Sequence, residues 1–279
     1  MTYRMLVPLH THPEGNTETI AVHVAEIARH LSADVHALAC AAEFPQASSP
    51  LGNYLLGVPA MIEDAREKSR SRGRTLFQAL RDRLDPAGIP LHTEWADCFP
   101  SLFGDVVAVR GRYHDLILVG AGTGDQASSP AMAEAAIFGS GRPTLLVPEA
   151  GPPGTPDHVL IAWDGSRVAA RAVADADPFL RRARTVTIAT VVDDKALEDA
   201  HAAERLAEHL ADHGIQARVR QVQGNGRPTA EALLHHMAEK GANLLVMGGF
   251  GHSRLRDFVL GGATRGVLDD VRRPVLLSH

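Results

Sequence analysis

A group of glycines near the C-terminus has the composition and spacing of a phosphate-binding turn. Gly248 and Gly249 open the group, Gly251 follows, and Gly261 and Gly262 close it. Glycine has no Cβ, so a ligand can approach its main chain closely and a positive φ costs little. Successive amides in such a turn form an anion-binding concavity. A helix that begins near Gly262 adds unpaired N–H groups and the positive end of its dipole.

Polar side chains accompany these glycines. His252, Arg254 and Arg256 lie inside the segment, and Thr264 follows it in the expected helix. Asp257 could contact a magnesium ion bound to the phosphates, an ion that usually keeps several of its waters. The alternative is a plain turn that needs glycine for packing. The number of glycines at a strand end and helix start favours anion binding.

An acidic residue follows an apolar run that we expect to form a strand. Asp164, in the run Trp163-Asp-Gly-Ser166, could accept hydrogen bonds from the vicinal hydroxyls of a ribose. The alternative is that Asp164 or Ser166 caps the helix that follows. A phosphate site nearby favours the ribose interpretation.

Other chemical motifs carry less weight. The chain has no Gly-x4-Gly-Lys-Ser/Thr loop, and the glycines of Gly120–Gly124 are not followed by the helix that a dinucleotide fingerprint needs. His209 and His213 share a helix face with acidic residues, which is typical of a solvated surface. His10 and His12 stand at a strand end and leave a metal or proton-transfer site as a minor alternative.

These residues belong to one of two copies of a repeated unit. Met5–His10 is echoed by 159–164, His114–Gly120 by 242–248, and Arg142–Val147 by 273–278, in the same order. Residues 48–59 are an insertion in the first copy. A segment rich in proline and glycine separates the copies. We expect domains over residues 1–150 and 157–279, joined by a linker over 151–156.

Apolar runs alternate with amphipathic stretches in each copy. In the second copy the expected strands are 158–163, 185–192, 217–222, 243–247 and 274–277, and the expected helices are 167–181, 195–213, 228–240 and 263–271. Strict alternation predicts an α/β fold with two tandem open, mainly parallel five-stranded sheets and helices on both faces. Ligands of such sheets lie outside the carboxyl ends of the strands.

The chain resembles a tandem member of the universal stress protein family, with one domain in each copy, and the resemblance is specific in the second copy. The resemblance rests on Asp164-Gly-Ser, on Val191-Val192-Asp193, and on Met247–Gly251 followed by Leu260-Gly261. It implies an adenine nucleotide alpha hydrolase-like fold in which ATP or AMP lies across the sheet end. Adenine would then meet Ala162 and Val191, ribose would meet Asp164, and phosphates would meet glycines and the Ala263 amide. The candidate nucleotide-binding residues are Ala162, Asp164, Val191, Gly248, Gly251, His252, Gly261, Gly262, Ala263 and Thr264.

The chain departs from the family pattern at two places. Gly262 stands where nucleotide-binding members usually have Ser or Thr, so a hydroxyl contact is missing unless Thr264 supplies it. In the first copy His10 replaces the acidic residue and Thr123 replaces a glycine. We expect the first copy not to be a working nucleotide site.

The overall composition argues against several classes of partner. A formal charge of −5 argues against general nucleic-acid binding, and the two cysteines make no disulfide framework. No apolar run reaches the roughly 20 residues that span a bilayer, and the N-terminus lacks the pattern of a signal peptide. We therefore expect a cytoplasmic protein without nucleic-acid or membrane partners.

The sequence favours a stress-response protein that binds ATP or AMP, with magnesium possible at the phosphates, and acts as a sensor or regulator rather than as a dedicated enzyme. The alternatives are an interaction module without nucleotide and a weak ATPase. By family resemblance, the two copies are expected to pair through their last strands, 143–147 and 274–277, and the chain could form a homodimer.

Overall fold

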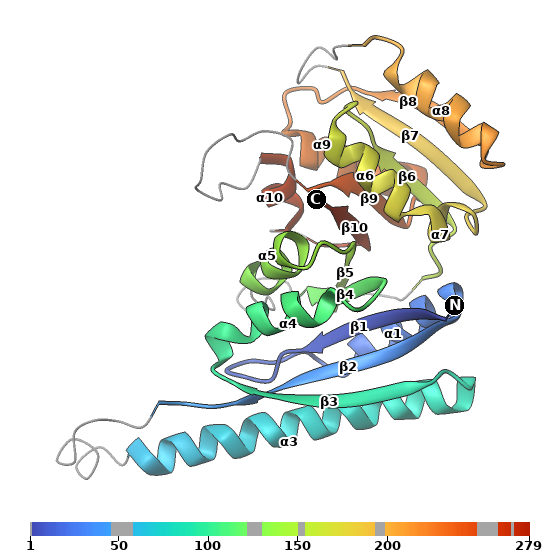
Figure 1. The fold of residues 1–279 in the computed structure, drawn as a ribbon. Coiled ribbons are helices and arrows are strands. Elements are labelled where there is room, and N and C mark those ends of the chain that lie inside the picture. Colours follow the sequence, from blue (N-terminus) through green and yellow to red (C-terminus); the bar gives the residue numbers. More distant parts are fainter. Residues whose placement is uncertain are drawn as a thin grey trace.

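A computed structural model describes residues 2–45, 58–121, 130–149, 154–192, 199–249, 262–268 and 271–279 of the 279-residue chain. Its strands form a single sheet of ten, in the order β3-β2-β1-β4-β5-β10-β9-β6-β7-β8 (Figure 1). The strands are β1 (Tyr3–Leu9), β2 (Ala33–Ala42), β3 (Leu91–Cys98), β4 (Leu116–Ala121), β5 (Thr144–Pro148), β6 (His158–Ala162), β7 (Thr185–Val191), β8 (Ala217–Val222), β9 (Leu244–Gly248) and β10 (Val275–Ser278).

The sheet has the same strand order in its two halves. In each half the first strand lies between the second and the fourth, and its pairings with both are parallel. The expected α/β fold with mainly parallel strands is confirmed. The two five-stranded sheets expected from the repeat are continuous with each other.

Helices cover both faces of this sheet. One buried cluster contains residues of α1, α3, α6, α7 and α8, and a second cluster on the other face contains residues of α4, α5, α9 and α10. The helices are α1 (Ile20–Leu31), α3 (Val58–Leu84), α4 (Phe103–Gly111), α5 (Pro130–Gly139), α6 (Arg167–Asp175), α7 (Asp177–Leu180), α8 (Ala202–Asp212), α9 (Thr229–Lys240) and α10 (Gly262–Leu268), with 3-10 turns η1 (Asp85–Ala87) and η2 (Pro100–Leu102).

The alternation of side chains along the strands divides the core between these faces. In β1, Met5 and Val7 belong to the cluster under α1, whereas Leu6 belongs to the cluster under α4. Central strands are therefore apolar on nearly every position, as parallel strands covered on both faces must be. None of the described helices is both long and apolar enough to cross a membrane.

Two expected helices differ from those observed. The helix expected over 167–181 is divided into α6 and α7, and Pro178 lies in the first turn of α7, where its missing N–H is tolerated. The helix expected from residue 195 begins only at Ala202, after the N-cap residue His201. The other strands and helices expected in this half agree with the structure to within one or two residues, apart from α10, which ends at Leu268.

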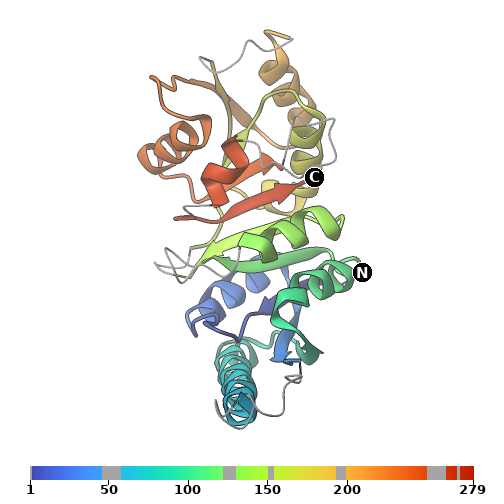
Figure 2. The same ribbon diagram turned by 90° about the vertical axis from the view of Figure 1, so that its left-hand side faces the viewer.

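The last strands of the two halves meet at the centre of the sheet, as expected. β5 and β10 lie side by side at the centre of the sheet (Figure 2). They run antiparallel, and Leu276 is paired with Leu145. Both leucine side chains are fully buried. Because each half contributes an otherwise exposed edge, the pairing removes two rows of free backbone groups.

Leu276→Ala tests how much the junction of β5 and β10 contributes to the stability of the fold. Removal of a fully buried leucine side chain from the sheet centre should lower the free energy of unfolding by about 2–5 kcal/mol. Urea denaturation of Leu276→Ala measures the loss. Leu102→Ala is the matched control, since Leu102 is 46% exposed and its truncation leaves no closed cavity. Equal losses of unfolding free energy in the two variants would mean that the side chains at the junction of β5 and β10 are not tightly packed.

Candidate functional site

The candidate site lies at the carboxyl ends of β6, β7 and β9. β6 pairs with β9 on one side and with β7 on the other, with Ile161 beside Val246 and Ala162 beside Ala189. The strand order therefore reverses beside β6, at the position where open α/β sheets bind ligands. Asp164 lies two residues after the end of β6, and Gly248 ends β9, so the sheet brings these two predicted residues to the same edge.

The two polar residues of the turn after β6 have different roles in this turn. Ser166 is the N-cap of α6, and its Oγ accepts the Ala169 N–H at 3.2 Å. Oδ1 of Asp164 accepts the Ser166 N–H at 2.9 Å across Gly165, whose φ of +74° suits glycine. Capping is thus the role of Ser166. The Asp164 side chain is fixed by the turn and exposed at the edge.

Three predicted residues share one apolar surface. Ala162, Val191 and Ala263 are half-buried, and all three pack against the cluster that contains Met247 and Val267. They lie at the ends of β6 and β7 and in the first turn of α10.

The two glycines at the end of β9 have packing roles of their own. A Cβ on Gly248 would lie 2.7 Å from both the backbone N of Ala169 and the backbone C of Val168. The Gly249 N–H donates to the Ser278 carbonyl at 2.7 Å and so continues the pairing of β9 with β10. Close approach of α6 to β9 therefore explains Gly248 without any ligand.

The start of α10 is open on one side. Gly262 is exposed, and a Cβ added to it would meet no atom within 4 Å. Thr264 is 3% exposed, so its hydroxyl points into the protein rather than to the open side of the helix start. Gly251, His252 and Gly261 lie outside the described residues, as do Arg254, Arg256 and Asp257.

The corresponding edge of the N-terminal half contains a buried carboxylate that the sequence did not reveal. Glu149 is 9% exposed and follows β5. Its Oε2 accepts the Thr17 N–H at 2.7 Å, and its Oε1 accepts a hydrogen bond from Nδ2 of Asn16. Oδ1 of Asn16 accepts the His10 N–H at 2.6 Å. The carboxylate therefore occupies the crevice between β1 and β4, just before α1.

Gly120 shows how tightly this crevice is filled. A Cβ on Gly120, in β4, would lie 2.5 Å from Oε1 of Glu149 and 2.8 Å from both Nδ2 of Asn16 and Cδ1 of Ile20. The loop between β1 and α1 supplies Asn16 and Thr17, and it is longer than the loop between β6 and α6. That difference in loop length was the available sequence signal.

The two histidines after β1 make local contacts. Nδ1 of His10 lies 2.9 Å from the Glu14 carbonyl, and the ring of His12 packs edge-on against Phe44 with centroids 5.0 Å apart. Burial is the largest cause that lowers the pKa of His12, followed by the positive neighbours His10 and Arg72. In the described part of the chain, no group of three or more His, Cys, Asp or Glu side chains could hold a metal ion.

Glu149→Gln tests the buried carboxylate. The amide keeps one acceptor but turns an NH2 group toward the donors Asn16 and Thr17, so one buried donor loses its partner. The free energy of unfolding should fall by about 1–3 kcal/mol in urea denaturation. Glu208→Gln, exposed on α8, should change it by less than about 0.5 kcal/mol. If Glu149→Gln leaves the free energy of unfolding unchanged, the crevice is accessible to water.

Gly248→Ala tests the packing explanation for the glycine at the end of β9. The new methyl group would meet backbone atoms that cannot rotate away, so we expect a loss of about 1–3 kcal/mol in unfolding free energy. Gly262→Ala is the matched control, since its Cβ enters open space. A tolerated Gly248→Ala would mean that α6 can shift away from β9.

Comparison with known proteins agrees with this geometry. The universal stress protein family matches residues 156–279. The universal stress protein YxiE of Bacillus subtilis (strain 168) is 36% identical over 74 residues, which are 26% of this chain and 48% of that protein. The matched region thus spans about half the length of this curated relative.

Two solved structures cover almost the whole chain. A universal stress protein from Archaeoglobus fulgidus DSM 4304 has a TM-score of 0.69 at 18% identity, over 99% of this chain and 97% of that chain. A functionally unknown protein from Pseudomonas aeruginosa PAO1 has a TM-score of 0.57 at 17% identity, over 98% and 92%. At these identities the likeness shows the fold alone. Together with the family match, it identifies residues 156–279 of this chain as a universal stress protein domain.

Proposed function

We propose that residues 156–279 bind an adenine nucleotide, ATP or AMP, and that the chain acts as a sensor or regulator in a stress response. The observation that carries this proposal is the Asp164 carboxylate, held exposed at the sheet edge beside the apolar surface of Ala162, Val191 and Ala263. A ribose needs a fixed acceptor, and an adenine ring needs an apolar surface. Both lie at the carboxyl ends of adjacent strands.

The described residues fit a nucleotide from the base to the start of the phosphates. Asp164 uses Oδ1 to hold its own turn, and the exposed carboxylate can accept hydrogen bonds from ribose hydroxyls. The open space beside Gly262 can admit a phosphate oxygen close to the first turn of α10. When bound, a magnesium ion would neutralise phosphate charge.

We further propose that the whole chain is a tandem-type universal stress protein. Its support is the identical strand order of the two halves and their antiparallel junction through β5 and β10. In this proposal the N-terminal half does not bind nucleotide, because Glu149 and Asn16 fill the equivalent crevice. We also propose that two such chains can form a homodimer, and light scattering measures this association.

Binding without dedicated catalysis is the simplest use of this edge. Its described residues offer a carboxylate engaged in a turn, backbone amides and small apolar side chains, which suit recognition better than proton transfer. Slow hydrolysis of ATP is a competing outcome, and phosphate release during the titration below would reveal it.

Isothermal titration with ATP and with AMP tests the proposal. Micromolar binding corresponds to about −8 kcal/mol. Asp164→Ala should weaken binding by about tenfold or more, because hydrogen bonds to a charged group contribute about 1.5–3 kcal/mol. Asp164→Asn, which keeps an acceptor for the Ser166 N–H, separates loss of charge from loss of the turn. Asp212→Ala, exposed on α8, is the control.

The outcomes of this titration are distinct. If folded protein binds neither nucleotide at sub-millimolar concentration, the chain is an interaction module and the nucleotide proposal is wrong. If Asp164→Ala binds as tightly as the unmodified protein, ribose does not lie at this edge. Gly262→Ser should strengthen binding severalfold, since open space surrounds that Cβ and the hydroxyl can reach a phosphate.

A further inference from the structure

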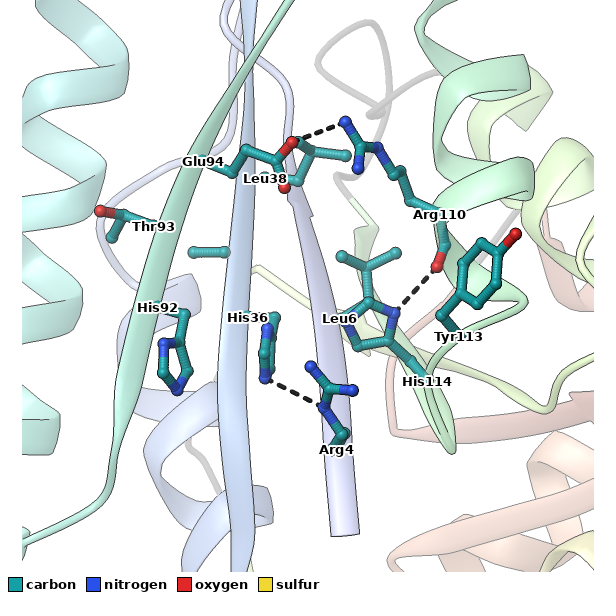
Figure 3. Close-up of a pocket in the computed structure, with 11 residues that line it drawn as sticks. Arg4, Leu6, His36, Leu38, His92, Thr93, Glu94, Arg110, Tyr113 and His114 are labelled. Atoms are coloured by element: carbon teal, nitrogen blue, oxygen red, sulfur yellow. Dashed lines mark hydrogen bonds and ion pairs between the residues drawn. The ribbon is translucent and has the colours of Figure 1, made fainter. Parts of the chain in front are cut away.

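A pocket opens on the N-terminal half of the sheet, away from the candidate nucleotide site (Figure 3). It has a cavity volume of about 410 Å³, within the range of small-molecule sites. Leu6 and Leu38 form its apolar floor, and both side chains are buried. Polar and aromatic side chains from β1, β2, β3 and the end of α4 surround this floor.

The pocket lies beside the last turn of α4. Phe103 and Val107 of α4 belong to the buried cluster on this sheet face, and the helix ends at Gly111. Arg110 in that last turn lines the pocket, together with Tyr113 and His114 just after the helix. The lining residues of the strands lie toward the amino-terminal ends of β1, β2 and β3, whereas Asp164 lies beyond the carboxyl end of its strand in the other half.

Strand register orders the polar residues along the pocket. Arg4 is level with Asp34, then His36 is level with Leu6 and His92, and then Leu38 is level with Glu94. The Glu94 carboxylate pairs with the Arg110 guanidinium at 2.6 Å. Figure 3 shows this ion pair at one end of the lining and Arg4 at the other, with Leu6 between them.

The charge at the Arg4 end is not neutralised by a direct ion pair. Nε of Arg4 donates to Nε2 of His36 at 3.4 Å, and Asp115 binds the backbone N–H of Arg4 rather than its guanidinium. Within the described ranges, no carboxylate forms an ion pair with this guanidinium. Arginine presents a planar set of donors that matches a carboxylate or phosphate group.

The imidazole rings give the pocket a flat aromatic wall. The ring of His36 stacks on that of His92 with centroids 4.5 Å apart, and it meets the ring of His114 edge-on at 4.9 Å. Burial, followed by the positive neighbours His114, Arg4 and His92, lowers the pKa of His36 to about 4. His36 is therefore neutral at pH 7, so Arg4 rather than His36 supplies positive charge at this end of the pocket.

We propose that this pocket binds a small planar organic carboxylate, whose carboxylate contacts the Arg4 guanidinium and whose ring packs against the imidazoles of His36, His92 and His114. An inorganic oxyanion alone would leave most of the cavity unfilled. A neutral ring would leave the guanidinium without a partner. The site is independent of nucleotide binding, because it lies in the other half and at the other end of the strands.

This set of residues is particular to the N-terminal half. By register, the position of His36 corresponds to Thr187 in β7, and that of Arg4 corresponds to His158 in β6. Thr187 is 7% exposed and its Oγ1 lies 3.3 Å from Nε2 of His158. The second half thus lacks both the guanidinium and the stacked imidazoles at these positions.

Titration of the full chain at pH 7 with three probes tests the proposal. Benzoate carries both the ring and the charge, benzamide carries the ring without the charge, and inorganic phosphate carries an oxyanion without the ring. Calorimetry and the ring-proton shifts of histidines report binding. For a probe of about nine non-hydrogen atoms, we expect benzoate to saturate with a dissociation constant on the order of 1 mM. Benzamide and phosphate should each bind at least about tenfold more weakly.

Substitution of one arginine identifies the site. Arg4→Met should weaken benzoate binding about tenfold or more, and the ring-proton shifts of His36 and His92 should be lost. Arg29→Met, on the opposite sheet face in α1, is the matched control and should bind as the unmodified protein does. The proposal is wrong if benzoate does not saturate, if benzamide or phosphate binds as tightly, or if Arg4→Met leaves the affinity unchanged.

Discussion

The close approach of a strand end to the start of a helix determines the chemistry of both halves of this protein. In each half the fourth strand ends beside the segment that leads into the first helix, and neither Gly120 nor Gly248 has room for a Cβ. At Gly248 the neighbour is the backbone of α6, so main chain lies directly against the end of β9. At Gly120 the neighbours are the side chains of Asn16 and Glu149, so the crevice is closed by a polar network.

This difference explains why two halves with the same strand order have different residues available to a ligand at the carboxyl ends of their strands. The N–H groups that precede a helix attract an anion, and in the N-terminal half the protein supplies that anion itself as the Glu149 carboxylate. In the C-terminal half Ser166 caps α6 with a neutral hydroxyl, and the carboxylate of Asp164 is turned outward. An internal anion excludes an external one. An outward carboxylate suits the hydroxyl groups of a sugar.

Much of the fold was predictable because it follows from local patterns. Apolar runs fixed the strands, and the repeat of Arg142–Val147 at 273–278 located the two strands that join the halves. The division of α6 from α7 was missed although Pro178 signals it. For Gly248 the sequence left a packing role as the alternative to phosphate binding, and only the distance to α6 shows how little room a Cβ has there.

Some residues of the candidate sites could likewise be assigned from the sequence, and others could not. Asp164 and Val191 could be assigned to one edge from sequence, because parallel strands place their carboxyl ends together. Glu149 could not, since it lies at the boundary of a segment interpreted as a linker, and its partner Asn16 is far away in the sequence. The pocket at Arg4 depends on the register of three strands and on where α4 ends, which no local pattern encodes.

The position of Glu149 also connects the filled crevice to the junction of the halves. Glu149 directly follows β5, the strand that pairs with β10, and its N–H donates to the Ala121 carbonyl at 3.0 Å. One residue therefore ties the end of β4, the start of α1 and the central strand of the sheet. A ligand that displaced its carboxylate would have to disturb the strand on which both halves depend. Asp164 in the C-terminal half forms no such tie, so the nucleotide binding proposed for that edge would not disturb the junction.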